Sequence, residues 1–436
     1  MRSRSRSVFA LILAAGALAG CGQGGDQPAR QPVVRVPADA ATITAGLGKL
    51  ADNGLLLISP GVYREAVTVD VPGATIRGTD RNAVVIDAEG TRPNGILVTS
   101  DGVTVQNLTV RAATFYGVLV TGMPGGGTGR TDGGYTKLDP DKFPPVQRFR
   151  VDHVTASNNG LYGIYAFDAQ HGMIENSYAS GSADSGFYVG QCRQCDITVR
   201  GNVAERNAVG FENANASDSV YIVGNRWSGN RIGMTMLSSY QEAFVPQRGN
   251  IVAGNVITAN TATDSPAQAS GGFGIGIGIS GGQDNTFQTN LIAGNPQAGV
   301  LINNAEDIPA TGNRITGNRF ADNGIDVADS STAQAPSKGN CLSGSPAPSA
   351  KPASLAGSTC PAGSPASEGI PAGALPPVSA PPGVSFLKVA PGRDQPNLSG
   401  DLEKAGPALP GTVGPPDLSA MAVPGSDLLA SLTGAR

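Results

Sequence analysis

Gly163-Ile164-Tyr165-Ala166 and Gly186-Phe187-Tyr188-Val189 are two copies of the short phrase that decides the fold of this chain. In this phrase a glycine is followed by an apolar residue, any residue, and then usually another small or apolar one. The phrase recurs with its glycine at Gly95, Gly117, Gly163, Gly186, Gly210, Gly233, Gly278, Gly299 and Gly324. The steps are 22, 46, 23, 24, 23, 45, 21 and 25 residues, and both double-length steps contain an insertion. A period near 23 residues with strand-type alternation predicts a parallel β-solenoid, with one coil per repeat.

The solenoid is expected to occupy residues 34–342 as an all-β domain of about ten coils. Glycine accounts for 61 of the 436 residues and aromatic residues for only 5%, which suits a turn-rich solenoid. The formal net charge is −4, and no lysine lies between Phe143 and Gln334. The body of the chain therefore carries no ammonium patch, and its composition gives no support to nucleic-acid binding.

The first 20 residues have the pattern of a secretion signal. Arg2, Arg4 and Arg6 precede a short apolar run, which is too short to span a membrane. The run ends in Leu18-Ala19-Gly20-Cys21, which resembles the lipobox of bacterial lipoproteins. That resemblance implies cleavage before Cys21, lipid attachment to its sulfur, and a short tether over residues 21–33. We expect an extracytoplasmic protein that is anchored to a membrane by its lipid.

Four cysteines remain after Cys21, and an even number in an oxidising compartment favours disulfide bonds. Proximity in sequence favours the pairs Cys192–Cys195 and Cys341–Cys360. The first pair could alternatively bind a metal or act as a redox pair. A complete zinc site would need two further ligands, and His171 is the only histidine nearby.

The N-terminal part of the predicted solenoid begins with a helix-like segment at residues 39–50, for which Asp39 is the expected N-cap. Soon after it comes Pro60-Gly61-Val62-Tyr63-Arg64-Glu65. This phrase resembles the "PGxYxE" phrase of the pectate-lyase-like superfamily, and the resemblance covers roughly residues 34–340. It implies a right-handed parallel β-helix. Within that superfamily the chain looks similar to bacterial β-helix lipoproteins of undetermined role, and to the periplasmic β-helix protein that helps to mature nitrous-oxide reductase.

Two other patterns concern the solenoid turns and the C-terminal part. Seven asparagines recur along the coils and predict a stacked asparagine ladder in a turn; they are Asn107, Asn176, Asn202, Asn225, Asn255, Asn290 and Asn318. Residues 345–436 hold 17 of the 32 prolines, together with Ala, Gly and Ser. Because such a segment cannot bury a core of its own, residues 343–436 are expected to form a disordered tail.

Alternation along the repeat assigns a direction to each side chain. The residue after the repeat glycine is apolar in every coil and points inward, so the next residue points outward. Tyr165, Tyr188 and Glu212 should therefore stand in one outward line, beside Asp168, Gln191 and Asn215, which follow the same strands. Aromatic faces with amide and carboxylate groups alongside are suited to a sugar chain. Tyrosines also decorate β-surfaces that bind no ligand.

Both insertions leave from the turn that follows this line, at residues 122–149 and 238–250, and could wall a groove. Gln247 and Arg248 lie in the second insertion and are candidate substrate-binding residues. For a polysaccharide lyase or epimerase, Asp168 and His171 could serve as neutraliser and base, with Tyr188 as the acid.

Asp168-Ala169-Gln170-His171 loosely resembles the Asp-Pro-His-Asp motif of mannuronan epimerases, but the proline and the second aspartate are missing. A glycosidase would instead use a carboxylate pair such as Asp184 and Glu212. The chain lacks the aspartate–aspartate–arginine pattern of pectinesterases and the clustered calcium aspartates of classical pectate lyases. Resemblance to the superfamily therefore does not by itself imply an activity for this chain.

The leading hypothesis from the sequence is a protein that binds or modifies a polysaccharide on a lateral groove of the solenoid. A non-catalytic scaffold or adhesin that meets a protein partner is the main alternative. A weaker alternative is copper handling, to which Met234 and Met236 would contribute. However, an inward position makes core packing the simpler interpretation of Met236. The sequence identifies no cofactor.

Overall fold

The computed structural model of the protein describes residues 29–123, 130–131, 134–135, 142–346 and 348–434. The predicted signal peptide and the predicted lipid site at Cys21 lie outside these residues. Among the described residues there is no helix that is both long enough and apolar enough to cross a membrane.

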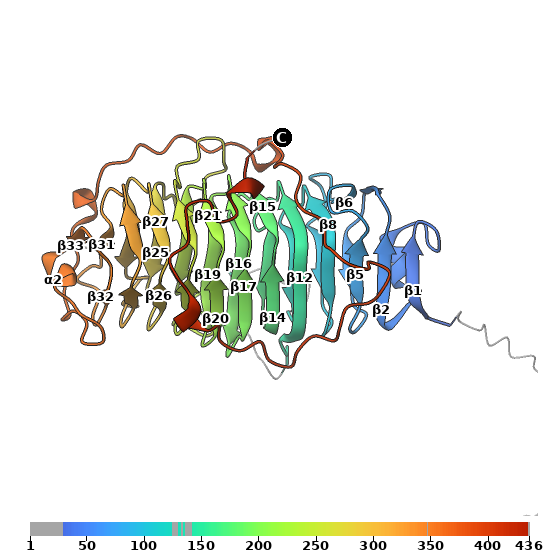
Figure 1. Ribbon diagram of the computed structural model, residues 1–436, viewed down its shortest axis with the longest axis horizontal. Coiled ribbons are helices and arrows are strands. Elements are labelled where there is room, and N and C mark those ends of the chain that lie inside the picture. Colours follow the sequence, from blue (N-terminus) through green and yellow to red (C-terminus); the bar gives the residue numbers. More distant parts are fainter. Residues whose placement is uncertain (1–28, 124–129, 132–133, 136–141, 347, 435–436) are drawn as a thin grey trace, which may run out of the picture.

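The chain folds into a right-handed parallel β-helix whose coils stack along one long axis (Figure 1). A 20-stranded sheet, called sheet A, contributes two strands to most coils, and an 11-stranded sheet, called sheet B, contributes one. The strands of sheet B are β4 (Val67–Val69), β7 (Asn94–Val98), β9 (Tyr116–Thr121), β13 (Ile164–Phe167), β16 (Ser185–Arg193), β19 (Val209–Ser217), β22 (Ile232–Leu237), β25 (Ile275–Ser280), β28 (Ala298–Asn303), β31 (Val327–Asp329) and β33 (Ala350–Lys351).

Sheet A occupies the other two sides of the coil. Its strands are β1 (Gln31–Val36), β2 (Leu50–Ile58), β3 (Gly61–Tyr63), β5 (Thr75–Gly78), β6 (Val84–Asp87), β8 (Thr104–Arg111), β12 (Val146–Ser157), β14 (Ala169–Glu175), β15 (Tyr178–Ser180), β17 (Ile197–Arg200), β18 (Val203–Glu205), β20 (Val220–Val223), β21 (Arg226–Ser228), β23 (Ile251–Ala253), β24 (Val256–Thr258), β26 (Thr286–Gln288), β27 (Leu291–Ala293), β29 (Arg314–Thr316), β30 (Arg319–Ala321) and β32 (Cys341–Ser343). A small antiparallel pair, β10 (Arg130–Thr131) and β11 (Gly134–Tyr135), lies outside both sheets. The prediction of a right-handed β-helix is confirmed.

The repeat phrase coincides with the sheet B strands, but its register differs from the prediction in two coils. Thr235 pairs with Gly278, so Gly276 and not Gly278 stands opposite Gly233. Val300 pairs with Val327, which places Asp326 rather than Gly324 opposite Gly299. The first error has a simple cause: residues 274–279 alternate glycine and isoleucine, so a shift by two residues leaves the sequence pattern unchanged.

The N-terminal cap is a short helix, α1 (Ile43–Leu47), and its N-cap is Thr42 rather than the predicted Asp39. Asp39 instead accepts a hydrogen bond from the Arg35 amide at 2.7 Å. The carboxylate of Glu65 binds the free amides of Ile43 and Thr44 at the start of the helix, at 2.9 and 3.0 Å. The glutamate of the "PGxYxE" phrase therefore has a structural role here, because it fastens the cap helix to the first coil.

The predicted asparagine ladder exists, and it is one of three, each at a different corner of the coil. The first runs through Asn202, Asn225, Asn255, Asn290 and Asn318 by side-chain amide bonds. The second runs through Asn207, Asn230, Asn260, Asn295 and Asn323. The third links Asn250, Asn285, Asn313 and Asn340. Asn107 and Asn176, which were predicted to join the first ladder, bind the Gly78 carbonyl and the Asp152 carboxylate instead.

Two disulfide bonds form as the spacing favours. Cys192 is bonded to Cys195 at the end of β16, with a Cα–Cα distance of 5.3 Å. Cys341 in β32 is bonded to Cys360, with a Cα–Cα distance of 5.2 Å. The second bond closes the last coil, where short α2 (Ala353–Ala356) follows the final strand of sheet B.

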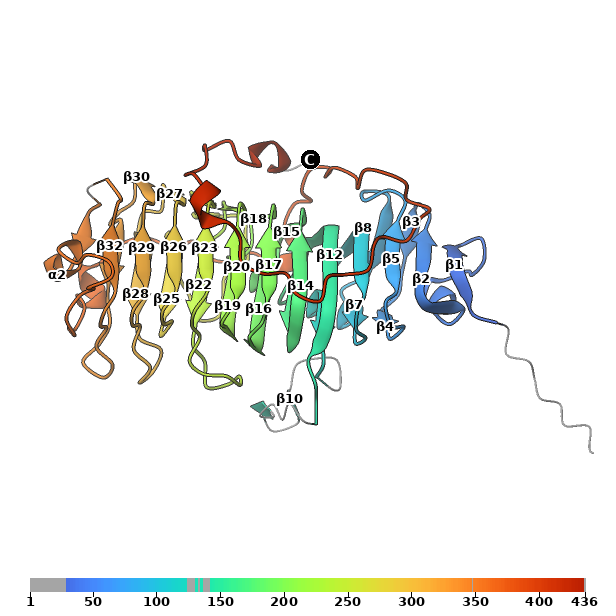
Figure 2. The ribbon, with the colours of Figure 1, turned by 60° about the horizontal axis from the view of Figure 1, so that its bottom comes forward.

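The C-terminal part is not the free tail that its composition predicted. After α2 the chain crosses to the outer side of sheet A as an extended segment with four short 3-10 turns, at Ala372–Ala374, Phe386–Lys388, Leu418–Ala420 and Ala430–Leu432. It runs toward the N-terminal coils along one edge, turns, and returns across the strands of sheet A (Figures 1 and 2). The segment does not need a core of its own, because charged and amide side chains of the solenoid bind its backbone.

Candidate functional site

The outward line on sheet B has the register that the sequence predicted. Tyr165 pairs with Tyr188, and Tyr188 pairs with Glu212. The line continues through Thr235 and Gly278 to Leu301. These residues come from six adjacent strands that follow one another along the solenoid axis.

The two tyrosines of this line do not form an open surface for a ligand. Tyr165 is 4% exposed and Tyr188 is 2% exposed. Their rings pack edge to face, with centroids 4.7 Å apart, and Tyr162 covers both at 4.7 and 4.5 Å. Tyr116 closes the cluster at 5.1 Å from Tyr165. The prediction of an exposed tyrosine surface is wrong, because Tyr162 from the preceding turn covers both rings. Strand alternation does not predict such a contact.

The loop of residues 238–250 also covers the tyrosine cluster. Its Glu242 carboxylate accepts a hydrogen bond from the Tyr188 hydroxyl. Asn215 donates to the Ser239 and Glu242 backbone carbonyls at 2.6 and 3.1 Å, and the side-chain Oε1 atom of Gln191 accepts from the Ala243 amide at 3.0 Å. Gln191 and Asn215 were predicted to bind substrate; in the structure both fasten this loop.

Three carboxyl groups, of Asp184, Glu212 and Glu242, are gathered beside the tyrosines. The Ser185 hydroxyl lies 2.7 Å from Glu212 and 3.3 Å from Asp184, and Gln268 donates to Asp184 at 2.8 Å. Burial raises the pKa of Asp184. Burial, and then the charge of Asp184, raise the pKa of Glu212 well above its ordinary value. Burial also raises the pKa of Glu242 to about 8. Glu242 is therefore mostly neutral at pH 7, and the surroundings of Glu212 favour its neutral form.

A pocket of about 380 Å³ opens next to Glu212, over the outer face of β22, β25 and β28. The pocket exists because Gly278 stands in the outward line between Thr235 and Leu301 and contributes no side chain. A turn over residues 268–272 forms one wall. The lining residues are Glu212, Ile232, Thr235, Leu237, Gln268, Ser270, Gly271, Gly272, Ile275, Gly278, Ser280, Leu301 and Asn303.

The lining combines apolar side chains with amides and hydroxyls. Leu237 and Leu301 provide apolar faces, and the Ser280 hydroxyl donates to the side-chain Oδ1 atom of Asn303 at 2.6 Å. The Thr235 hydroxyl is buried and has no hydrogen-bond partner among the described residues. None of the described residues that line the pocket is Lys, Arg or His. A neutral ligand rich in hydroxyl groups fits such a surface, and an anionic one does not.

Asp168 and His171, the predicted neutraliser and base, lie in different surroundings in the structure. Asp168 is buried where β13 ends; its Oδ2 atom has no partner among the described residues, and burial raises its pKa to about 7. His171 lies in β14 of sheet A, where its Nδ1 atom is 2.8 Å from Asp196. That aspartate also accepts the Val413 and Gly414 amides of the C-terminal segment. His171 therefore lies beside the C-terminal segment and faces away from the sheet B pocket.

The remaining predicted residues support the base of the loop. Gln247 is fully buried and exchanges two side-chain bonds with Asn285, at 2.9 and 3.0 Å. Arg248 forms an ion pair with Asp218 at 3.2 Å. The pocket wall was not predicted, because the 45-residue step contains a second loop, at residues 259–274, besides the loop of residues 238–250. Its signal was the Gly271-Gly272 pair, which marks a turn.

The cysteines and methionines that were candidates for metal binding have structural roles. Cys192 and Cys195 form a disulfide bond, and Met234 and Met236 are fully buried in the solenoid core. In the described part of the chain, no group of three or more His, Cys, Asp or Glu side chains is placed to hold a metal ion.

Two family models match this chain. Residues 60–266 match the family described as periplasmic copper-binding protein (NosD), and residues 244–354 match the family described as right handed beta helix region. No curated protein matches the sequence.

Several solved structures are similar in fold. One is the A-module of the Azotobacter vinelandii mannuronan C-5 epimerase AlgE4, with 16% identity, 67% of this chain and 86% of that chain covered, and a TM-score of 0.42. Pectate lyase Pel9A has 14% identity, coverage of 72% and 80%, and a TM-score of 0.45. The Dettilon tailspike protein has 13% identity, coverage of 73% and 67%, and a TM-score of 0.46.

Proposed function

We propose that this chain, which belongs to the right-handed parallel β-helix superfamily, is an extracytoplasmic protein that binds a neutral polysaccharide on the outer face of sheet B. The observation that carries the proposal is the pocket over Gly278, with its amide and hydroxyl lining and no cation. At about 380 Å³ it lies within the ordinary size range of ligand pockets.

The pocket chemistry favours a neutral sugar over a uronate. The hydroxyl groups of a sugar can bond to Thr235, Gln268 and Asn303, while Leu237 and Leu301 offer apolar surface to its ring. A uronate would need a cation for its carboxylate, and it would meet Glu212 instead. This argues against the lyase and epimerase roles that the sequence suggested for Asp168 and His171.

The catalytic form of the proposal is a hydrolysis in which Glu212 is the general acid. Burial raises the pKa of its carboxyl and so favours the protonated form, which an acid that protonates a leaving glycosidic oxygen needs. Asp184 contacts the same Ser185 hydroxyl and is the matching second carboxylate. Glu212→Gln should then abolish turnover of a bound glycan while leaving its affinity nearly unchanged.

The first experiment is a glycan array probed with the full secreted chain, followed by titration of the strongest hit. Gly278→Val fills the gap between Thr235 and Leu301. It should weaken binding about tenfold or more without destabilising the fold, since the nearest neighbour of an added Cβ atom lies at 3.6 Å. Gly411→Val is the matched control, because that glycine has no neighbour within 4 Å. The proposal fails if no glycan binds, or if Gly278→Val binds as tightly as the unsubstituted protein.

Membrane anchoring through Cys21 is part of the same proposal and rests on the lipobox. Two disulfide bonds support an oxidising compartment. Cells that express Cys21→Ser should release the protein from the membrane fraction and should not incorporate labelled fatty acid into it. Retention of the variant in the membrane would exclude a lipid anchor.

Copper handling is a second candidate, because residues 60–266 match the periplasmic copper-binding (NosD) family. The described residues do not fit a copper site. Cys192 and Cys195 are bonded to each other, and Met234 and Met236 are buried in the solenoid core. Copper content of the purified full chain decides between the candidates. Stoichiometric copper would favour this candidate. A metal-free protein that binds no glycan would favour the scaffold or adhesin interpretation.

A further inference from the structure

The C-terminal segment, residues 381–434, lies as a loop on the outer side of sheet A and contacts coils far apart along the solenoid. Its outgoing part passes Arg231, then Asn158, and reaches the N-terminal coils at Arg77. Its returning part passes Asp196 and ends at Glu205. Figure 2 shows the returning part crossing the strands of sheet A. The segment therefore touches most of one face of the solenoid.

The solenoid recognises this segment mainly through its backbone. Arginine and asparagine side chains of the solenoid donate to its carbonyl groups, and four of them bind two carbonyl groups each: Arg231 binds Pro381 and Pro382 at 2.7 and 2.9 Å, Asn158 binds Phe386 and Val389 at 2.6 and 2.9 Å, Arg77 binds Leu402 and Lys404 at 2.8 and 2.6 Å, and Arg226 binds Ser426 and Leu428 at 2.9 and 3.1 Å. Two carboxylates and two side-chain amide oxygens accept from its backbone amides: Asn82 from Gln395 at 2.9 Å, Asn107 from Leu398 at 2.7 Å, Asp196 from Val413 and Gly414 at 2.7 and 2.9 Å, and Glu205 from Gly434 at 2.9 Å.

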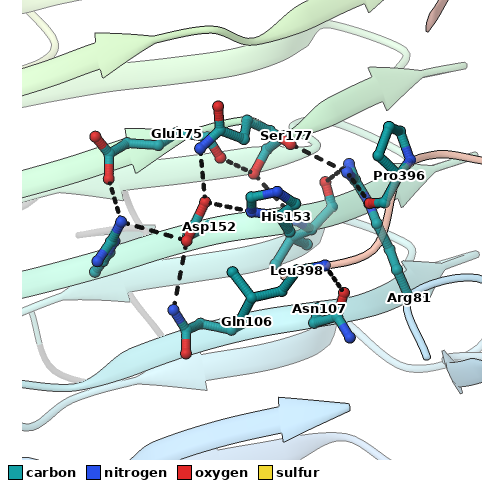
Figure 3. A network of polar contacts seen from close by, with 12 residues as sticks. Arg81, Gln106, Asn107, Asp152, His153, Glu175, Ser177, Pro396 and Leu398 are labelled. Carbon is teal, nitrogen blue, oxygen red and sulfur yellow. Dashed lines mark hydrogen bonds and ion pairs between the residues drawn. The ribbon is translucent and has the colours of Figure 1, made fainter. Parts of the chain in front are cut away.

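The groups that bind the segment are held in place by the solenoid itself. Arg81 is 1% exposed and donates to Thr155 and to the carbonyls of Val154 and Asn176, as well as to Pro396 at 3.2 Å. Figure 3 shows Arg81 pointing at Pro396, with Asn107 facing Leu398 beside it. Asn107 is fixed on its other side by the Gly78 carbonyl at 2.9 Å. Such preorganised donors and acceptors lose little freedom when a chain binds to them.

The segment itself contributes little to the core. Within residues 381–434 only Val389 and Gln395 are buried, and the other described side chains there are exposed or partly exposed. Proline removes an amide and favours an extended backbone, which leaves carbonyls available to the arginines. Solenoid side chains bind the amides of Gln395, Leu398, Val413, Gly414 and Gly434, none of which is a proline. The composition that predicted disorder is therefore suited to this mode of binding.

We propose that the outer face of sheet A is a binding track for an extended, proline-rich polypeptide that is recognised through its backbone, and that residues 381–434 fill it as a detachable ligand from the same chain. Attachment to the solenoid gives the segment a high effective concentration at the track. The track is separate from the proposed glycan pocket on sheet B.

The test uses the full chain with a specific protease site inserted between Ser379 and Ala380, two exposed residues. After cleavage, the fragment of residues 380–436 should co-elute with the solenoid in size-exclusion chromatography. It should dissociate from the solenoid in moderate denaturant. Once released, a labelled synthetic peptide of the same residues should bind the solenoid saturably and be displaced by unlabelled peptide. Far-UV circular dichroism of the nicked and stripped protein reports whether the solenoid stays folded.

Matched variants report whether the backbone contacts carry the binding. Arg226→Gln removes the donor to Ser426 and Leu428 and should weaken the peptide about tenfold, whereas Arg319→Gln, an exposed arginine of β30, should not. In the peptide, Val413→Pro removes the amide that Asp196 accepts and should have a similar effect, while Ala408→Pro at an exposed position should not. Failure of the peptide to bind a folded solenoid would overturn the proposal. Unfolding of the solenoid upon removal of the segment would also overturn it, because the segment would then be a part of the fold and not a ligand.

Discussion

The outer faces of the two sheets differ in charge and in what covers them. On sheet B, Asp184, Glu212 and Glu242 gather under loops that emerge from the same coils, and a pocket stays open beside them. Along the outer side of sheet A, Arg77 and Arg226 on its strands and Arg81 and Arg231 in adjacent turns donate hydrogen bonds to a distant part of the chain. The comparison shows that one stack of coils can carry two unlike surfaces, because outward residues do not contribute to the shared core.

The largest expected effect concerns the buried arginine of sheet A. Arg81→Met should lower the free energy of unfolding by about 2–4 kcal/mol, because Thr155 and two solenoid carbonyls lose their donor. Burial lowers the pKa of Arg81 to about 9, so the side chain is charged at pH 7. Denaturant unfolding measures the effect.

Arg319→Met, at an exposed position of β30, is the control and should change stability by less than about 0.5 kcal/mol. Equal effects of the two substitutions would mean that the contacts of Arg81 contribute nothing beyond those of a surface arginine.

The next effect concerns the buried acids of sheet B and depends on pH. Because burial raises the pKa of Glu242 to about 8, this group stabilises the fold fully at low pH, and its contribution is lost as the pH rises from about 4.5 to 8. Glu242→Gln keeps the acceptor for Tyr188 but cannot ionise. It should therefore be more stable than the unsubstituted protein by about 1–3 kcal/mol at pH 9, with little difference at pH 5.

Unfolding curves at both pH values decide this prediction. Glu306→Gln, at an exposed glutamate, should show no pH-dependent difference. A Glu242→Gln variant that gains nothing at pH 9 would show that the carboxyl is solvated.

The smallest effect is local and concerns the returning part of the C-terminal segment. Burial opposes ionisation of Asp196, but its bonds to His171 and to the Val413 and Gly414 amides outweigh burial and lower its pKa. The contribution of the carboxylate is therefore present above its ordinary pKa of about 4 and is lost as the pH falls through the lowered value.

Asp196→Asn should speed hydrogen exchange of the Val413 and Gly414 amides about tenfold at neutral pH. The same change at the exposed Asp322 should not alter exchange there. Unchanged exchange in Asp196→Asn would mean that other contacts hold this part of the segment.

The sequence could predict what depends on period and alternation. It places Tyr165, Tyr188 and Glu212 in one line, because side chains of a strand alternate and coils stack in register. It could not predict that the tyrosines are buried, since their cover comes from Tyr162 and from the loop that carries Glu242. Cover of this kind depends on how loops fold in three dimensions.

Two larger differences between prediction and structure also arise from contacts that local sequence does not specify. The predicted register placed Gly278 two residues away from the outward line, so the pocket above it was not predicted. The error arose because glycine and isoleucine alternate along this strand, and the pattern fits two registers equally well. The C-terminal segment was predicted to be disordered, because its composition reports only what it can bury by itself. Its order comes from residues such as Arg81 and Asn107, more than 280 positions earlier in the chain.

The most direct test of the two-surface account is hydrogen exchange of the full chain with and without the glycan that binds best on the array. We predict slower exchange in β22, β25, β28 and the turn of residues 268–272, with no change in residues 381–434. Protection confined to the C-terminal segment or to sheet A, or the absence of any glycan that slows exchange at the pocket, would contradict the assignment of sheet B as the polysaccharide surface.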